Sequence, residues 1–284
     1  MEFIALYISK VNILYIMVAL AIIGFLGTFL MIPMFKGMLT EGEIVRPNYK
    51  GDMIPVSMGI VFIPMLIINS ILLTFYINKP LNMMYLFIFM ASLLAMAFAG
   101  IMDDIIGNRS VSGLKGHFKS LLKGKLTTGG FKALFGGFIG ILVSVAITRN
   151  PAEIIVNTLI IALSTNLMNL MDLRPGRAIK VYLVIMITIT ATVTGFIKVL
   201  PMLILPSVLA YFNQDLKAKC MMGDAGSNVL GISIGLMMVF GYSMPVKIAW
   251  LVFLVLIHIF TEKYSLTKII EKNKILNFLD RLGR

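Results

Sequence analysis

The chain has 284 residues, of which 59% are hydrophobic and only 13% are charged, and its formal net charge is +12. Its mean hydropathy of +0.95 is too high for a soluble domain, because apolar runs of about 20 residues recur along it. Stretches such as 56–77 are apolar on every face, whereas a β-barrel strand alternates apolar and polar residues. The composition therefore predicts an all-α, polytopic membrane protein. The basic residues lie in short loops between apolar spans, which favours anionic lipid or anionic substrates over nucleic acid.

Hydropathy predicts about nine transmembrane helices, which lie near residues 11–35, 54–77, 83–102, 129–148, 152–171, 179–195, 197–213, 227–243 and 246–261. Residues 195–201 are expected to form a tight hairpin between the sixth and seventh spans. The first apolar segment has no small-residue cleavage site, so we expect it to remain as a membrane helix. With Cys220 as its single cysteine, the chain cannot form an intramolecular disulfide.

The basic residues predict the orientation of the chain. Of its 25 Lys and Arg residues, 20 lie in one set of alternate loops, and the positive-inside rule makes that set cytoplasmic. The N-terminus is then outside and the C-terminus cytoplasmic. The same assignment places Asp103, Asp104, Asp172 and Asp224 on the cytoplasmic side, although acidic residues played no part in choosing it.

The chain is expected to form one membrane domain over residues 1–284, because it shows no internal repeat and no Pro- or Ser-rich linker. In its last segment, 262–284, apolar residues recur at helical spacing among Lys, Arg and Asn. This pattern predicts an amphipathic helix on the cytoplasmic membrane surface.

The main functional signal is the placement of four aspartates at the ends of apolar runs, in a chain with only 13 acidic residues. A carboxylate at a membrane boundary is costly unless it binds or reacts with something. Asp103 and Asp104 close the third span, where the helix C-terminus disfavours further negative charge. The alternative interpretation is a pair of solvated charges balanced by Arg109 and Lys115.

A second polar group follows the fifth span. Asn166, Asn169 and Asp172 share one helix face, which predicts either the lining of a cavity or hydrogen bonds between helices. In Gly223-Asp224-Ala-Gly-Ser227, Asp and Ser are favoured helix caps. The same geometry also presents a helix N-terminus to an anion and a carboxylate to a cation. With the lysine-rich loop 115–125, these groups suit phosphoryl transfer with Mg²⁺ at the membrane surface.

Five segments in this order resemble one known family. They are Arg46-Pro-Asn with Pro55-Val-Ser-Met-Gly59, then Gly100-Ile-Met-Asp-Asp104, Gly113-Leu with Lys119, Asn166-Leu-Met-Asn-Leu-Met-Asp172, and Gly223-Asp-Ala-Gly-Ser227. The chain resembles the polyprenyl-phosphate N-acetylhexosamine-1-phosphate transferases, which move a sugar-1-phosphate from a UDP-sugar to a polyprenyl phosphate with Mg²⁺ and release UMP.

The resemblance implies roles for individual residues. Asp103, Asp104 and Asp224 are expected in the catalytic centre, with Asp224 and Asp172 as ligands of Mg²⁺, or of Mn²⁺ in its place. The residues expected to bind substrate are Lys50, Lys119, Asn166, Asn169, Asp172, Arg174, Arg177, Gly223, Ser227 and His258.

The chain also departs from the family. It reads Asp172-Leu-Arg-Pro-Gly-Arg177 where the family commonly continues with a second aspartate. Arg174 and Arg177 are expected either to bind an additional acidic group on the donor or to anchor the cytoplasmic face. The family that the chain resembles includes bacterial phospho-MurNAc-pentapeptide transferase, and the histidine-rich loop of that enzyme is absent here. Met221 stands where an aromatic residue could stack on uracil. These features favour a divergent member that uses GlcNAc-1-phosphate or a related sugar phosphate.

The resulting hypothesis is a transferase of the plasma membrane whose site faces the cytoplasm and which acts in cell-envelope polymer synthesis. Its expected partners are the membrane, a polyprenyl phosphate and a UDP-sugar, and dimers are usual among the enzymes that it resembles. The alternatives are a non-catalytic relative that binds lipid phosphate or nucleotide sugar, and a transporter. A transporter is expected to carry charges in the middle of its spans.

Overall fold

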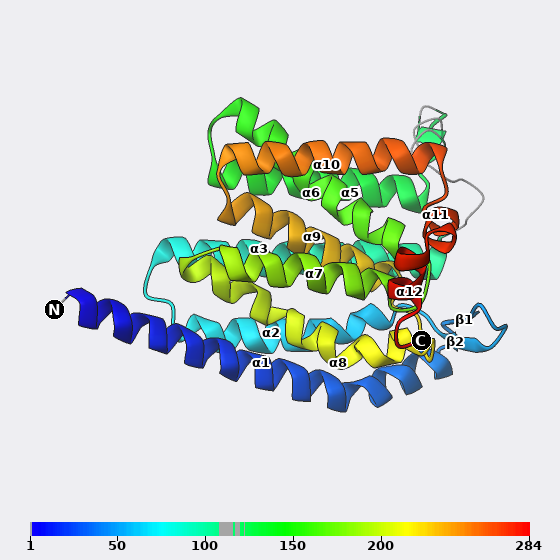
Figure 1. Ribbon diagram of the computed structural model, residues 1–284, viewed down its shortest axis with the longest axis horizontal. Coiled ribbons are helices and arrows are strands. Elements are labelled where there is room, and N and C mark those ends of the chain that lie inside the picture. Colours follow the sequence, from blue (N-terminus) through cyan, green and yellow to red (C-terminus); the bar gives the residue numbers. More distant parts are fainter. Residues whose placement is uncertain (1, 108–115, 117–119, 122) are drawn as a thin grey trace.

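The structure is a computed structural model that describes residues 2–107, 116, 120–121 and 123–284, with residues 2–12 described as backbone only. It is a helical bundle with one small β-hairpin (Figure 1). In chain order its elements are α1 (Glu2–Glu41), β1 (Val45–Pro47), β2 (Met53–Pro55), η1 (Met58–Val61), α2 (Phe62–Thr74), α3 (Pro80–Ile106), α5 (Thr128–Ile147), α6 (Pro151–Met171), α7 (Arg177–Thr192), η2 (Gly195–Leu203), α8 (Leu205–Leu216), α9 (Gly223–Gly241), α10 (Met244–Lys263), α11 (Leu266–Lys272) and α12 (Lys274–Arg281).

The prediction of an all-α, polytopic membrane protein is confirmed. Within the described residues, seven helical segments are long and apolar enough to cross a membrane. They are Ile13–Glu41, Pro80–Ile106, Thr128–Ile147, Pro151–Met171, Gly195–Leu216, Gly223–Gly241 and Met244–Lys263.

The other two predicted spans form shorter apolar helices, Met58–Thr74 and α7 with its 16 residues. At 1.5 Å per residue, α7 covers about 24 Å, which is less than the roughly 30 Å of the hydrocarbon core. The count of nine therefore stays a prediction. Residues 195–203 form the 3₁₀ helix η2, so the tight hairpin expected at 195–201 was wrong.

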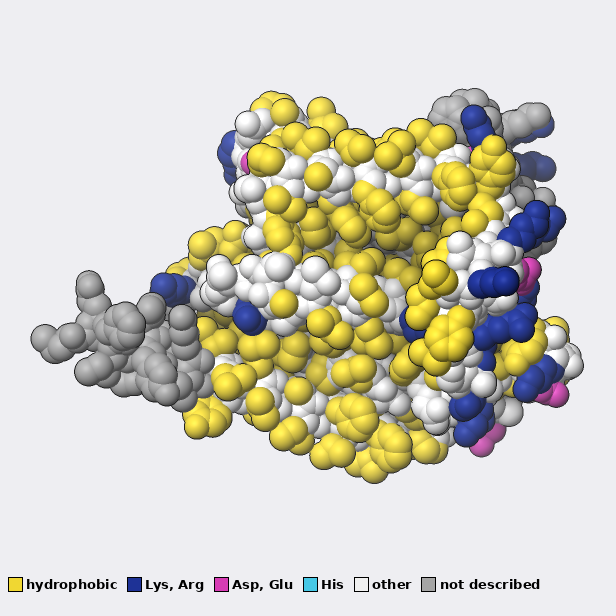
Figure 2. Space-filling model, in the orientation of Figure 1, with side chains coloured by type: hydrophobic (Ala, Val, Ile, Leu, Met, Phe, Trp, Pro, Cys, Tyr) yellow, Lys and Arg dark blue, Asp and Glu magenta, His cyan; other side chains and the backbone are white. Residues whose placement is uncertain are grey.

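The two termini lie at opposite ends of the bundle (Figure 1). The hairpin β1–β2 and the helices α11 and α12 lie at the same end as the C-terminus. On the face drawn in Figure 2, hydrophobic side chains cover most of the surface along the bundle, and Lys and Arg side chains gather chiefly at the end where the C-terminus lies. This distribution agrees with the predicted cytoplasmic side, although the sidedness itself stays a prediction.

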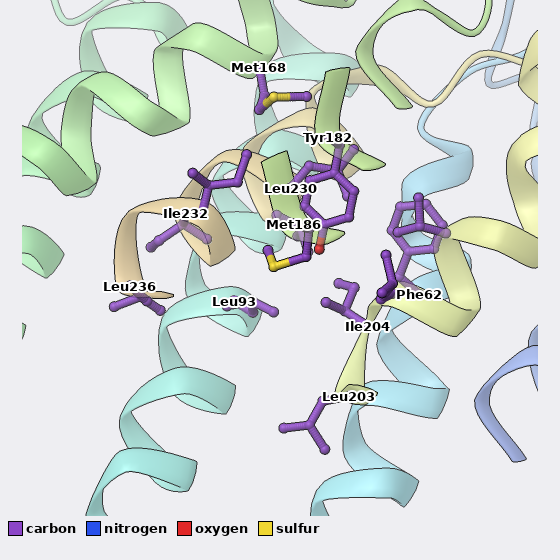
Figure 3. Packing of buried hydrophobic residues seen from close by; sticks show 14 of the residues in the cluster. Phe62, Leu93, Met168, Tyr182, Met186, Leu203, Ile204, Leu230, Ile232 and Leu236 are labelled. Carbon is purple, nitrogen blue, oxygen red and sulfur yellow. The ribbon is translucent and has the colours of Figure 1, made fainter. Parts of the chain in front are cut away.

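Helix α9 is the centre of the bundle. Of its apolar window, 83% is buried, against 17% for α1 and for α10, so α9 packs inside while α1 and α10 present apolar side chains outward. Figure 3 shows the packing, in which side chains of α9 such as Leu230 and Leu236 meet Leu93 of α3 and Met186 of α7. Small residues let the helices approach closely, as where Gly231 faces the backbone of α6.

The C-terminal segment forms two short helices, α11 and α12, where the sequence predicted one. Asn273 separates them, because its side chain accepts hydrogen bonds from the first N–H groups of α12. The segment is tied to the start of α7 by a buried ion pair between Arg177 and Asp280. Its apolar side chains Ile275, Phe278 and Leu279 are exposed, as expected of a helix that lies on a membrane surface.

Candidate functional site

The polar segments singled out in the sequence meet in one cavity of about 930 Å³ at the C-terminal end of the bundle. The hairpin, the end of α3, the start of α5, the end of α6, the start of α9 and the end of α10 line it. The predicted site residues that line it are Asp103, Asp104, Asn166, Asn169, Asp172, Arg174, Gly223, Asp224 and His258.

Asp104 joins the end of α3 to the start of α9. Its carboxylate accepts hydrogen bonds from the backbone N–H of Asp224 (3.0 Å), the N–H of Ala225 (3.0 Å) and the hydroxyl of Ser57 (2.6 Å). The guanidinium of Arg46 donates to the Asp104 carbonyl at 2.6 Å. A carboxylate at a helix N-terminus satisfies donors that have no partner within the helix and interacts favourably with its dipole. Because Asp104 takes these two N–H groups, they are not free for the anionic ligand that the sequence suggested at the start of α9.

Glycines make this junction possible. A Cβ at Gly100 would overlap the backbone of Asp224, so only glycine lets α3 approach the first turn of α9 this closely. A Cβ at Gly59 would likewise overlap Gly226. Gly223 has φ of +71°, a left-handed conformation that side chains disfavour. These glycines therefore leave room for the end of α3, which carries Asp104, to pack closely against the start of α9, which carries Asp224.

Asp103 and Asp224 share one lysine. The ammonium of Lys132, on α5, lies 3.0 Å from an Asp103 oxygen and 2.5 Å from an Asp224 oxygen. The side chains of Asp103 and Lys132 are 17% exposed, and that of Asp224 is 28% exposed. Two carboxylates from different helices thus lie side by side at the cavity, with one cation between them.

Asn169 connects α6 to α9. Its amide oxygen accepts the hydroxyl of Ser227 at 2.6 Å, and its NH₂ group donates to Asn228 at 2.9 Å. Ser227 is fully buried behind the cavity wall, so it supports Asn169 from behind. The sequence left open whether this face lines a cavity or joins helices, and Asn169 does both.

Asp172 follows the end of α6 and faces the cavity. Within the described part of the chain, its carboxylate has no hydrogen bond and no ion pair. Burial, followed by the like charges of Asp215, Asp224 and Asp104, raises the pKa of Asp172 well above its ordinary value of 3.8. A cation entering the cavity would relieve that repulsion.

The structure separates the two arginines that the sequence treated together. Arg174 lines the cavity and pairs with Glu271 of α11 at 3.2 Å, with both side chains exposed. Arg177 does not line it. Its guanidinium is buried and binds both oxygens of Asp280 at 2.7 and 3.0 Å. Arg177 thus holds the C-terminal helices, and only Arg174 is placed to meet a substrate.

Three further predicted residues remain. Lys50 is exposed on the hairpin, over the ring of Tyr49, and does not line the cavity. Lys119 lies outside the described residues. His258 lines the cavity from α10, where its Nδ1 lies 2.6 Å from the Leu254 carbonyl. That contact places a proton on Nδ1, and the buried Nε2 has no partner within the described residues.

Comparison with known proteins identifies the family of the chain. A family model described as glycosyl transferase family 4 matches residues 85–242, which is more than half of the chain and runs from α3 to the start of the turn after α9. The chain belongs to glycosyl transferase family 4. No curated protein matches the chain. Membership confirms the resemblance seen in the sequence and makes the protein a membrane transferase of sugar phosphates, with polyprenyl phosphate as the general acceptor.

The resemblance implies a divalent ion at this family 4 site, and the side chains that line the cavity include carboxylates that could hold one. Among the described residues, no group of three or more His, Cys, Asp or Glu side chains is arranged to hold a metal. Mg²⁺, however, is commonly held by one or two carboxylates together with substrate phosphates and water. Asp103 and Asp224 supply such a pair, and Asp172 lines the same cavity. The residues therefore fit an ion that arrives with a phosphate ligand.

Sequence reasoning missed four residues of the site. Lys132 is one of the 20 basic residues that the topology assigns to the cytoplasmic loops, although a lysine in the first turns of an apolar span is itself a signal of a nearby carboxylate. Arg46 and Ser57 stand in segments that carried the resemblance, but they were given no role. Asn228 gave no signal, because an asparagine inside an apolar helix is as often a contact between helices.

Proposed function

We propose that the protein transfers GlcNAc-1-phosphate, or a related sugar phosphate, from a UDP-sugar to a polyprenyl phosphate with Mg²⁺ and releases UMP. The reaction takes place at the cytoplasmic face of the plasma membrane, in cell-envelope polymer synthesis. One observation carries the proposal: Asp103 and Asp224, from two helices of the matched family region, lie at one cavity with a lysine between them. Mn²⁺ is expected to support the same reaction in place of Mg²⁺.

The cavity has a polar part that suits the donor. Lys132, Arg174 and the hairpin residues Arg46 and Asn48 line it, so positive and hydrogen-bonding groups surround the carboxylates. The donor diphosphate needs such cations, because the carboxylates of Asp103, Asp172 and Asp224 would otherwise repel its two negative charges. Arg174 can bind phosphate or carboxylate oxygens with two parallel hydrogen bonds, which favours a donor that carries an acidic group near the sugar.

The cavity also has an apolar part that suits the acceptor. Met96 of α3, Ala133 and Gly136 of α5, Leu163 of α6 and Ile259 of α10 line it. Their helices are among those of membrane-spanning length and composition. A polyprenyl chain buries apolar surface favourably along such a wall, and this would leave its phosphate near the carboxylate end.

The proposed reaction forms a bond between an acceptor phosphate oxygen and the β-phosphorus of the donor, and it breaks the bond from that phosphorus to the bridging oxygen. UMP leaves with the bridging oxygen. Asp224, with Asp172 and Asp103, would hold Mg²⁺, which neutralises the diphosphate and stabilises the charge on UMP. No strong base is required, because a phosphate monoester is already largely ionised near neutral pH. Asn169, which lines the same cavity, is left to orient the donor.

The test is a release assay on purified protein with polyprenyl phosphate, Mg²⁺ and a panel of UDP-sugars. We expect UMP release with at least one donor, which depends on both the lipid and the metal. If every donor is silent while labelled UDP-sugar or lipid phosphate still binds, the protein is the non-catalytic relative. A homodimer is also expected, and cross-linking in native membranes tests it separately.

A further inference from the structure

Lys132 lies where the two carboxylates of the site meet. Its ammonium is within ion-pair distance of one oxygen of Asp103 and one oxygen of Asp224. Each of the three side chains comes from a different helix, so the cluster is set by the packing of α5 against α3 and α9. All three are largely buried at the cavity wall. The lysine is therefore held as an internal counter-ion.

Lys132 balances the negative charge of two carboxylates at the site. Asp104 is satisfied by the backbone of α9 and by Ser57, and it needs no cation. In the described part of the chain, Lys132 is the basic side chain that forms ion pairs with Asp103 and Asp224. Without it, two neighbouring carboxylates would repel each other in a largely buried position.

We propose that Lys132 competes with the divalent cation for Asp103 and Asp224. The inference rests on the proposed function, because it concerns the metal of that reaction. A cation that takes these two carboxylate oxygens as ligands cannot do so while the ammonium holds them. The metal therefore displaces Lys132, and the intrinsic affinity of the ligand-free site for metal is low.

Displacement of Lys132 from the two carboxylates couples the binding of the metal to the binding of the donor. A lysine has a flexible four-carbon stem, so its ammonium can leave the carboxylates without movement of α5. A donor diphosphate in the cavity offers the ammonium a new anionic partner. Metal and diphosphate then enter together, whereas the metal alone must leave the lysine without a counter-ion. Lys132 acts as a positioning residue before the donor arrives and as a phosphate contact afterwards.

Direct Mn²⁺ binding tests the inference without any turnover. Purified protein in detergent, free of nucleotide and lipid, is titrated with Mn²⁺, and the unbound ion is read by electron paramagnetic resonance. We expect Lys132→Met to bind Mn²⁺ about tenfold or more tightly than wild type, because it removes a positive charge that contacts both ligands. Lys132→Arg keeps the charge and should remain as weak as wild type. Lys217→Met removes an exposed lysine that does not line the cavity, and it should leave the affinity unchanged.

The variants are compared only where their thermal unfolding is cooperative, and Lys132→Gln replaces Lys132→Met if that variant does not fold. Equal Mn²⁺ affinity in wild type and the neutral variants would overturn the competition and leave the proposed function standing. An increase in Lys217→Met as large as in Lys132→Met would overturn it too, because the effect would then be one of net charge. If no protein binds Mn²⁺ and UMP release is also metal-independent, the proposed metal chemistry fails as well.

Discussion

The two adjacent aspartates Asp103 and Asp104 are predicted to fail in different ways when each is changed to Asn. Asp104 accepts three hydrogen bonds with both of its oxygens, from Asp224 N–H, Ala225 N–H and Ser57. Asparagine offers one oxygen and places an NH₂ group where the other stood. At least one donor at the start of α9 then loses its acceptor.

The magnitude follows from those contacts. An unsatisfied buried donor costs about 1–3 kcal/mol, and the remaining bonds lose the strength that the carboxylate charge gives them, so Asp104→Asn should cost about 2–4 kcal/mol. That corresponds to a fall in Tm of roughly 5–12 °C for a chain of this size. Asp103→Asn leaves Lys132 paired with Asp224 and relieves the repulsion between the two carboxylates, so its cost should stay smaller, at about 1 kcal/mol or less.

Thermal unfolding of detergent-purified protein, followed by intrinsic fluorescence, measures the first effect. UMP release at a temperature well below both transitions measures the second. We expect Asp104→Asn to unfold early, and Asp103→Asn to unfold like wild type while its activity falls at least tenfold. The reasoning is refuted if Asp104→Asn keeps the wild-type Tm, or if Asp103→Asn is destabilised as much as Asp104→Asn.

Three further predictions follow from the same contacts. Gly100→Ala should lower Tm and activity together, because its Cβ overlaps the first turn of α9 and overpacking costs about 1–3 kcal/mol. Gly137→Ala is the control: its Cβ meets no other atom within 4 Å, so Tm and activity should stay unchanged. In the UMP assay, Asp224→Asn should reduce activity more than Asp103→Asn, and equal or reversed losses would count against Asp224 as the main metal ligand. Asp280→Asn should release the C-terminal helices and expose them to trypsin. Burial raises the pKa of Asp280, but its arginine partners outweigh this and hold it below 3.8, so the pair stabilises the folded state above that pH. The fall in Tm that Asp280→Asn causes should thus be constant near neutral pH and shrink as pH falls through the lowered pKa.

Much of the fold was predictable because membrane spans are read from hydropathy alone. Each of the nine predicted spans corresponds to a helical segment, but α2 and α7 are shorter than a bilayer requires, and hydropathy does not measure where a helix ends. The 3₁₀ helix η2 was missed because Gly195 and Pro201 are equally typical of a turn.

The proximity of several candidate residues was predictable, whereas their contacts were not. Asp103, Asp224 and Asn169 line one cavity, and the predicted topology had already placed the ends of their three spans on one side of the membrane. Sequence spacing could not show that Asp104 caps α9, because that contact joins residues 120 positions apart. Nor could it show that Arg177 is paired with Asp280, which lies 103 residues away. Charges near a predicted site are therefore sorted into ligands and structural pairs only by the tertiary fold.

The central claim is that the protein transfers a sugar phosphate rather than a sugar. The most direct test supplies the protein with polyprenyl phosphate, Mg²⁺ and UDP-GlcNAc labelled at its β-phosphorus. If the release assay selects a related UDP-sugar as the donor, that UDP-sugar is labelled in the same way. The account predicts that the label moves into a lipid-soluble product, that the released nucleotide is unlabelled UMP, and that Asp224→Asn abolishes the transfer. Label that stays with the nucleotide as UDP while sugar enters the lipid would contradict it.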